Sequence, residues 1–245
     1  MSGKLDGKVA LITGGSSGMA LATAELFVEE GGLVYITGRR QQLLDEAARR
    51  LGPRLRGISA DAADLEDIES LFATITAEAG RLDIFYASAG VGKLDESLSE
   101  VTPASFDEVF GLNVRGTLFA AQRAAELMTG GGAIILNGSA AAAKAIPGSS
   151  VYAASKAALR SFAQVWSAEL ADRGIRVNVL HPGPIDTPAL DRLSPEARDY
   201  LISLTTVGRL GEPREVAGTV LFLASADAGF VSGTELFVSG GMGQS

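Results

Sequence analysis

The sequence of 245 residues contains no cysteine and a single histidine, His181. Without cysteine the chain cannot form disulfide bonds, use a thiolate nucleophile or hold zinc through sulfur, and it fits a reducing compartment. It also lacks an apolar run approaching the roughly 20 residues that a membrane-spanning helix needs, and its first residues lack the apolar core of a signal peptide. We therefore expect a cytoplasmic protein with no metal site and no membrane partner.

Positive charge is scarce as well. Lysine and arginine number 21 against 29 acidic residues, which gives a formal net charge of −8. Because no basic stripe compensates for this balance, we expect no nucleic-acid partner. The content of 47% hydrophobic and 20% charged residues is sufficient for a sizeable buried core, and the 30 glycines fit many tight turns.

Short apolar, β-branched runs alternate with longer helical patterns along the whole chain. We predict strands at residues 9–13, 33–37, 55–59, 82–87, 133–137, 175–180 and 235–238. Helical stretches separate the first six strands, and a loop and a helix near 213–224 precede the seventh. This alternation predicts an α/β fold with a doubly wound, mostly parallel sheet and helices on both faces. With no internal repeat and no linker, we expect one domain over residues 1–245.

The first turn, which reads TGGSSGMA over residues 13–20, lies directly between a predicted strand and a helical run. Glycines in such a turn let the backbone approach a pyrophosphate, and free N–H groups at the helix N-terminus hold its charge. A glycine turn can also serve packing alone, but its placement favours nucleotide binding. The predicted cofactor contacts in this turn are Gly14, Ser16, Ser17, Gly18 and Met19.

The end of the second strand bears on the choice of nucleotide. An NAD site usually has an acid here that holds the ribose hydroxyls, whereas a 2′-phosphate needs room and a cation. Gly38 offers the room and Arg39 the cation. The alternative is a solvated pair of arginines opening a helix, and we expect Arg40 to lie mostly at the surface. Asp61 follows the third strand, where it can accept from an adenine amino group. Helix capping is the alternative for Asp61, but Asp64 suits that role better.

A long helix is predicted over residues 149–170, and it carries Tyr152 and Lys156. Residues four apart lie over one another on a helix, so the phenol and the ammonium group project into the same space. A neighbouring cation favours the phenolate, and we therefore expect a lowered pKa for Tyr152. Taken alone, this spacing favours an ordinary surface pair over a functional one.

Other small and polar residues fall where ligands bind in open α/β folds. Ser139 follows the fifth strand and places a hydroxyl at the carboxyl edge of the sheet, although turn chemistry also explains a serine there. Small residues at 88–90 follow the fourth strand and let a cofactor lie against the backbone. Asn113 is unfavourable within a helix, so it either bonds neighbouring backbone or works in a site.

Taken together, these motifs resemble the pattern of the short-chain dehydrogenase/reductase family. The similarity spans almost the whole chain, including HPGPIDT at 181–187 and the glycine-rich end at 238–241. It implies a seven-stranded Rossmann-like sheet and a homotetramer assembled through the helix that bears Tyr152 and its neighbour. The motif residues follow the family order: Thr13, Gly14, Gly18, Asn113, Ser139, Tyr152 and Lys156.

The resemblance also implies roles for individual residues. Tyr152 would donate a proton to a carbonyl oxygen that Ser139 steadies. Lys156 would bind the nicotinamide ribose and lower the phenol pKa, and Asn113 would hold a water molecule of the proton relay. The further residues implied to contact the cofactor are Asp61, Ala62, Ser88, Ala89, Gly90, Tyr152, Lys156, Pro182, Gly183, Ile185 and Thr187.

Two positions depart from the family pattern, and one residue invites a separate interpretation. Ala20 replaces a glycine, which we expect the helix–strand packing to tolerate. Ser88 replaces an asparagine that ties strands and cofactor together, which puts stability near the cofactor in doubt. His181 has no carboxylate placed in the sequence to orient it, so we predict a structural or pocket-wall role.

We predict NADPH-dependent, reversible reduction of a neutral, fairly hydrophobic ketone, because the expected pocket wall at Val91, 140–143, Ile146 and a mobile substrate loop at 184–207 is largely apolar. The first alternative is reduction of 3-oxoacyl groups on acyl carrier protein. It is disfavoured because the turn at 128–132 offers no cation to an acidic carrier. The second alternative, a dinucleotide-binding sensor without turnover, would be expected to lack Tyr152 or Lys156.

Overall fold

The computed structural model describes residues 3–242, and within them seven strands join one parallel sheet in the order β3-β2-β1-β4-β5-β6-β7. The strands are β1 (Val9–Ile12), β2 (Leu33–Gly38), β3 (Leu55–Ser59), β4 (Ile84–Ala87), β5 (Gly132–Asn137), β6 (Ile175–Pro182) and β7 (Glu235–Val238). Every neighbouring pair is parallel. The predicted doubly wound Rossmann-like fold is confirmed, and the strand order reverses between β1 and β4, where such folds bind ligands.

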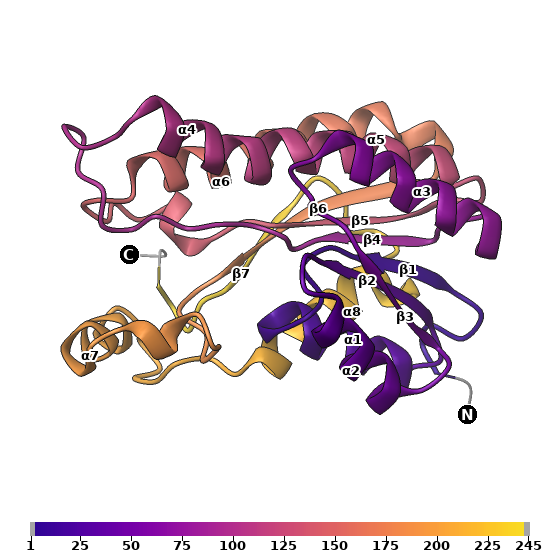
Figure 1. Cartoon of the computed structure of the whole chain (residues 1–245), viewed down its shortest axis with the longest axis horizontal. Helices are drawn as coiled ribbons and strands as arrows, with labels where there is room; N and C mark the ends of the chain where they lie inside the picture. Colours follow the sequence, from indigo (N-terminus) through magenta and orange to yellow (C-terminus); the bar gives the residue numbers. More distant parts are fainter. Residues whose placement is uncertain (1–2, 243–245) are drawn as a thin grey trace.

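Two layers of helices cover the sheet (Figure 1). The α-helices are α1 (Gly18–Glu29), α2 (Gln41–Leu51), α3 (Leu65–Ala79), α4 (Pro103–Phe110), α5 (Thr117–Leu127), α6 (Ser150–Glu169), α7 (Pro195–Ser203) and α8 (Pro213–Ala224). A π-helix, η1 (Gly111–Gly116), joins α4 to α5, and the 3-10 turns are η2 (Ala140–Ala142), η3 (Ala171–Arg173), η4 (Leu190–Arg192) and η5 (Ala226–Ala228). Helices α3, α4, α5 and α6 lie on one side of the sheet, and α1, α2 and α8 lie on the other.

The core consists of two apolar clusters, one on each face of the sheet. Phe27 of α1 and Val220 of α8 are fully buried in the first cluster, whereas Leu71 of α3 and Leu159 of α6 lie in the second. All four residues of β1 are buried, as expected for a parallel strand that is covered on both sides. Within residues 3–242, no helix is both long and apolar enough to span a bilayer.

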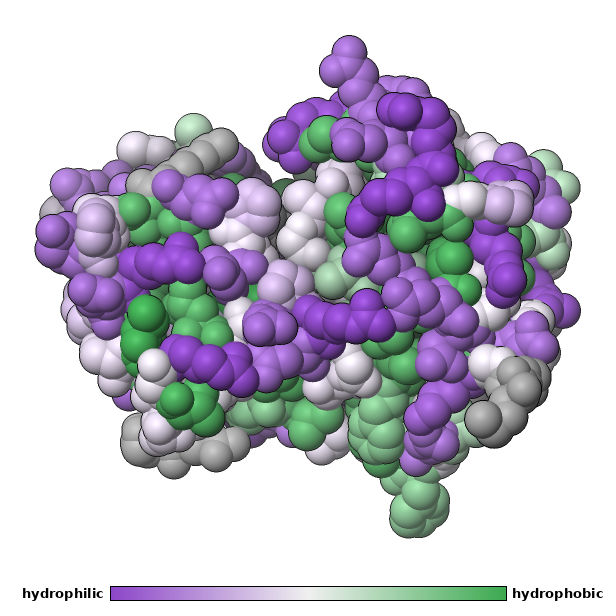
Figure 2. Space-filling view, turned by 90° about the horizontal axis from the view of Figure 1, so that it is seen from below, coloured by the Kyte–Doolittle hydropathy of each residue, from purple (hydrophilic) through white to green (hydrophobic). Residues whose placement is uncertain are grey.

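The segment at 184–207 differs from the mobile loop that the sequence predicts, because it contains η4 and α7. The Ser194 hydroxyl accepts a hydrogen bond from the Ala197 amide at 3.2 Å, and Pro195 occupies the first turn, where its missing N–H costs nothing. Figure 1 shows α7 set apart from the two layers. In Figure 2 a notch separates this part of the surface, at the left, from the main body.

Two predicted helices agree closely with the structure. Helix α6 begins at Ser150 and ends at Glu169, within one residue of the predicted 149–170. Helix α3 has Asp64 as its N-cap, and the carboxylate accepts from the Glu66 and Asp67 amides at 2.8 and 3.3 Å. The capping role assigned to Asp64 is therefore confirmed.

The π-helix offers a matched test of packing. A methyl group at Gly116 would overlap the carbonyl oxygen of Ala62, whereas one at Gly111 would meet no atom within 4 Å. Gly116→Ala should lower the free energy of unfolding by about 1–3 kcal/mol through overpacking, and Gly111→Ala should raise it by up to about 1 kcal/mol. Urea unfolding measures both changes, and equal effects at the two positions would contradict this packing.

Candidate active site

Three of the predicted catalytic residues meet where β5 ends beneath α6. The Ser139 side chain lies near the Tyr152 hydroxyl and lowers the pKa of the phenol, and both residues line the same pocket. Lys156 is buried, its Nζ donates to the Asn137 carbonyl oxygen at 2.7 Å, and it lies 5.8 Å from the centre of the Tyr152 ring. The Ser139 Oγ also accepts from the Ala141 amide at 3.2 Å, so the turn after β5 fixes the position of the hydroxyl.

The acidity of the phenol differs from the sequence-based prediction. Burial raises the pKa of Tyr152 above its ordinary value, and only the nearby Ser139 side chain acts in the opposite direction. The expected lowering by Lys156 is therefore not found, because desolvation of the phenolate outweighs the other influences. A neutral phenol at pH 7 is suited to donating a proton rather than to removing one.

Burial also changes the acidity of Lys156. Desolvation lowers its pKa from 10.5 to about 8, since the charged form has left water. An added Cβ on Gly90 would lie 3.1 Å from the lysine Nζ and 3.1 Å from Asn113 Oδ1. The lack of a side chain at Gly90 therefore lets the turn after β4 approach both polar groups.

Asn113 bonds the neighbouring backbone, one of the two alternatives that its sequence position left open. The side chain is buried, and its Oδ1 accepts from the Val91 amide at 2.9 Å. Its Nδ2 donates to the Val91 carbonyl oxygen at 2.9 Å and to Ser155 Oγ at 3.0 Å. Both amide hydrogens are thus in use, and Asn113 ties the turn after β4 to α6.

A cleft of about 440 Å³ opens at the point where the strand order reverses. Its lining includes the predicted cofactor residues Gly14, Ser16, Ser17, Gly38, Arg39, Asp61, Ala62, Ala89 and Gly90. Thr37, Ala60 and Leu112 also line the cleft and were not predicted, and Arg40 is exposed at its edge, as expected. Leu112 belongs to the π-helix, whose irregular backbone has no clear sequence signal.

The turn before α1 fits a pyrophosphate. Gly14 has a φ of 71°, and an added Cβ there would lie 3.0 Å from the Ala89 Cα, so this close approach requires glycine. Ser17, the N-cap of α1, makes no side-chain hydrogen bond to the first turn. The N–H groups at this helix N-terminus are therefore left for an anion.

The two departures from the family pattern are accommodated. Ala20 is buried, and its methyl group packs in the core between α1 and the sheet. At the other position, the Thr13 hydroxyl accepts from the amides of Ser88 and Ala89 at 3.1 Å each and holds this turn. Nearby, the buried Tyr86 hydroxyl donates to Asn137 Oδ1 at 3.0 Å and joins β4 to β5.

Arg39 and Asp61 face each other across the far end of the cleft. The Arg39 Nη1 lies 4.0 Å from Asp61 Oδ2, and the arginine side chain is 80% exposed. Asp61 Oδ1 accepts from the Ala63 amide at 3.0 Å, so the carboxylate is partly engaged in its own turn. An added Cβ on Gly38 would lie 3.1 Å from Ser16 Oγ. The lack of a side chain at Gly38 therefore leaves space at this end of the cleft.

A second pocket, of about 230 Å³, adjoins Ser139 and Tyr152 and has a mainly apolar wall. Of the predicted wall, Ala140, Ala141 and Ile146 line it, and the predicted segment at 184–207 contributes Leu190 and Leu201, but Val91, Ala142 and Ala143 do not line it. The predicted cofactor residues Met19, Pro182, Gly183, Ile185 and Thr187 also line this pocket. Leu94 and Met242 line it as well and were not predicted, because they approach from distant parts of the chain.

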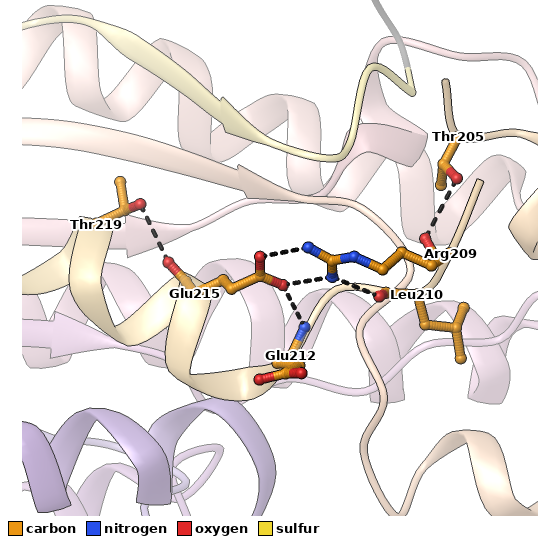
Figure 3. A network of polar contacts seen from close by, with 6 residues as sticks. All are labelled: Thr205, Arg209, Leu210, Glu212, Glu215 and Thr219. Carbon is orange, nitrogen blue, oxygen red and sulfur yellow. Dashed lines mark hydrogen bonds and ion pairs between the residues drawn. The ribbon is translucent and has the colours of Figure 1, made fainter. Parts of the chain in front are cut away.

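An ion pair between Arg209 and Glu215 joins the end of the segment at 184–207 to the start of α8 (Figure 3). Two Arg209 nitrogens donate to the two Glu215 carboxylate oxygens at 2.8 and 2.7 Å, and the Glu212 amide donates to Glu215 Oε2 at 2.7 Å. Thr205 Oγ1 donates to the Arg209 carbonyl oxygen at 3.2 Å. The guanidinium group lowers the pKa of Glu215 to about 2, and the network fixes the start of α8.

Residues 14–243 match the family model described as Enoyl-(Acyl carrier protein) reductase. The oxidoreductase asL5 of Sarocladium schorii is 43% identical over 244 residues, which cover 98% of each protein. The 3-oxoacyl-(acyl-carrier-protein) reductase FabG of Thermotoga maritima is 33% identical over 98% of this chain and 99% of that protein. The solved structure of the angucycline C-6 ketoreductase LanV with bound NADP has a TM-score of 0.94 and 34% identity, covering 100% of this chain and 99% of LanV.

The chain belongs to the short-chain dehydrogenase/reductase family of oxidoreductases. Members of this family bind a nicotinamide cofactor, and the cleft at the reversal of strand order has the form that such a cofactor needs.

The buried ammonium group gives a prediction for stability against pH. The pKa of Lys156 is about 8 in the folded protein and 10.5 in the unfolded chain. Between pH 8 and 10.5 the unfolded chain therefore binds more protons than the folded chain, so the free energy of unfolding rises with pH. Lys156→Met removes this contribution. Across that window, the wild type should gain about 3 kcal/mol in free energy of unfolding relative to the variant. Urea unfolding of both proteins between about pH 7 and 10 tests this, and parallel pH profiles would contradict it.

Proposed function

We propose that the protein reduces a neutral, fairly hydrophobic ketone to a secondary alcohol with NADPH, and that the reaction is reversible. The observation that carries this proposal is the proximity of Tyr152 and Ser139, which line one mainly apolar pocket while Lys156 lies buried behind it. When bound, NADPH supplies the hydride that adds to the carbonyl carbon. The residues of the chain then need only orient the ketone and deliver one proton.

Tyr152 is the proton donor in this proposal. The hydroxyls of Tyr152 and Ser139 both hydrogen-bond the carbonyl oxygen, and the phenol proton passes to that oxygen as negative charge develops on it. Lys156 holds the nicotinamide ribose and stabilises the phenolate that remains. Asn113 supports the site by fixing the turn after β4, and any water that it holds must bind atoms other than its two amide hydrogens.

The preference for NADPH rests on Gly38 and Arg39. No acidic side chain stands at position 38 to bind ribose hydroxyls or to repel a 2′-phosphate. The exposed Arg39 is held only loosely, 4.0 Å from Asp61, so its guanidinium group is free to bond the phosphate. LanV, solved with NADP, supports the same choice of cofactor. Asp61 remains our candidate for the adenine amino group.

The substrate proposal rests on the second pocket. Among residues 3–242, no lysine, arginine, aspartate or glutamate lines it, and leucine, isoleucine, methionine, alanine and proline predominate. Such a wall favours an uncharged ketone over a sugar phosphate or a carboxylate. We further propose that residues 1–245 form one catalytic domain in which 184–207 is the substrate loop.

The alternative is reduction of 3-oxoacyl groups on acyl carrier protein. The similarity to FabG of Thermotoga maritima and the description of the family model support it. This reaction uses the same catalytic residues. It needs a basic landing surface for the acidic carrier, and residues 128–132, Met-Thr-Gly-Gly-Gly, carry no cation. We therefore rank it second.

Tyr152→Phe should reduce ketone turnover by roughly 10²- to 10⁴-fold, because only the hydroxyl delivers the proton. Binding of NADPH, followed by fluorescence titration, should stay nearly unchanged. Tyr200→Phe removes a hydroxyl from an exposed tyrosine on α7 and serves as the matched control. Turnover by Tyr152→Phe within about threefold of the wild type would contradict the proposal that Tyr152 donates the proton.

Wild-type protein should prefer NADPH over NADH by roughly ten- to a hundredfold in kcat/KM, because hydrogen bonds to charged groups contribute about 1.5–3 kcal/mol. The double variant Gly38→Asp, Arg39→Ile should reverse the preference, since the acid binds ribose hydroxyls and repels the phosphate. Steady-state kinetics with both cofactors provides the measurement. Equal or better use of NADH by the wild type would overturn the proposal.

We propose a cytoplasmic homotetramer as the working form. A groove between α5 and α6 supports contact between subunits, and Val165 nearby is half exposed. The lining of the groove combines apolar residues (Leu118, Ala121, Trp166 and Leu170) with polar ones (Gln122, Glu126, Glu169 and Arg173). Light scattering at micromolar concentration should give the mass of four chains. A monomer would refute this assembly.

A further inference from the structure

The single histidine lies directly behind the predicted catalytic serine. His181, near the end of β6, is 1% exposed, and its ring stacks on Phe237 of β7 with 4.8 Å between ring centroids. An added Cβ on Gly138 would lie 2.6 Å from the His181 Nδ1, so the ring occupies space that a glycine leaves free. This geometry brings the imidazole against the backbone that carries Ser139.

The two ring nitrogens face different groups. Nδ1 lies 3.2 Å from the Ser139 backbone nitrogen and 3.0 Å from its carbonyl oxygen. Nε2 is buried and lies 3.3 Å from Glu235 Oε2, without the angles of a full hydrogen bond. The carboxylate is held in turn by Arg160 of α6, whose Nε lies 2.6 Å from Glu235 Oε1. A chain of contacts therefore runs from α6 through β7 and β6 to Ser139.

The parallel register explains how a carboxylate reaches this buried ring. Val179 pairs with Glu235 and His181 pairs with Phe237, so these side chains project from one face of the sheet. The sequence analysis found no carboxylate to orient His181, because Glu235 lies 54 positions further along the chain and only the pairing of β6 with β7 brings the two together.

The carboxylate selects one tautomer of the ring. Burial lowers the pKa of His181, so the imidazole is neutral at pH 7 and carries one proton. With the proton on Nε2, the N–H points toward Glu235 and the Nδ1 lone pair accepts the Ser139 amide hydrogen. With the proton on Nδ1, a lone pair would face the carboxylate, and the Ser139 amide would lose its acceptor. The first arrangement gives the Glu235 carboxylate a donor and the Ser139 amide an acceptor. The Ser139 carbonyl oxygen, 3.0 Å from Nδ1, then receives no proton from the ring but keeps the hydrogen bond that the Ala142 amide donates at 3.0 Å.

We propose that His181 is a positioning residue for Ser139, in which Glu235 holds the imidazole in the Nε2–H form so that Nδ1 accepts the Ser139 amide and fixes the serine hydroxyl beside Tyr152. This inference rests on the proposed function. His181 contacts neither substrate nor cofactor in it, and the effect on the reaction passes through the backbone of Ser139 alone.

The tautomer can be measured without any assay of activity. Because His181 is the only histidine, the imidazole nitrogens of untagged protein give a single set of signals in a long-range ¹H–¹⁵N NMR spectrum. The wild type should show the Nε2–H tautomer. Glu235→Met should shift the ring toward a mixture of both forms, and Arg160→Met should change it less, because it leaves the carboxylate in place. A wild-type ring protonated at Nδ1 would overturn the proposal even if the protein reduces ketones.

Kinetics then separate positioning from packing. His181→Asn keeps an acceptor near the place of Nδ1, whereas His181→Leu keeps none, and both lose the stacking on Phe237. The two variants should therefore be destabilised alike in urea, but kcat should fall roughly tenfold in His181→Leu and only about threefold in His181→Asn, with KM for ketone and affinity for NADPH unchanged. Equal kcat values, or losses confined to KM, would show that His181 only packs. Absence of turnover in the wild type would instead count against the proposed function.

Discussion

The burial of one positive charge governs the arrangement of the site. Lys156 Nζ leaves water to bond the Asn137 carbonyl oxygen at the end of β5, and desolvation lowers its pKa to about 8. The buried ammonium group needs neighbouring backbone that approaches it without a side chain in between. Gly90 lets the turn after β4 approach, and Tyr152 lies one helical turn earlier on α6. The carboxyl ends of β4 and β5 and the first turns of α6 thus meet at one ammonium group, next to both the cleft and the apolar pocket.

Much of the fold could be predicted from the sequence, because its signals are local. Alternating apolar runs gave every strand to within two residues, and the spacing of Tyr152 and Lys156 placed both on one helix face. Helix α7 was missed although Ser194 and Pro195 carry an ordinary helix-start signal. The contact between His181 and Glu235 could not be predicted, since it depends on the register of two strands far apart in sequence. The raised pKa of Tyr152 could not be predicted either, because the spacing of Tyr152 and Lys156 indicates proximity to a cation but not the extent of burial.

The site combines fixed and adaptable parts. Hydrogen bonds from the backbone hold Ser139 and Asn113, and the bidentate pair of Arg209 and Glu215 anchors the segment that closes the pocket. By contrast, Arg39 is exposed at the far end of the cleft and has only a loose partner. Under the proposed function, catalytic geometry depends on buried contacts near the sheet, whereas the choice of cofactor depends on one exposed side chain. Substitutions at the two ends should affect different kinetic constants.

The central claim is that this pocket serves reduction of a neutral ketone, and a matched substrate panel tests it most directly. The panel pairs an uncharged cyclic or aryl ketone with its carboxylate-bearing analogue and adds a 3-oxoacyl thioester, each scored by NADPH consumption at equal concentration. The account predicts turnover of the uncharged ketone, with kcat/KM well above that of the charged analogue and of the thioester. Preference for the thioester, or no consumption with any uncharged ketone, would contradict it.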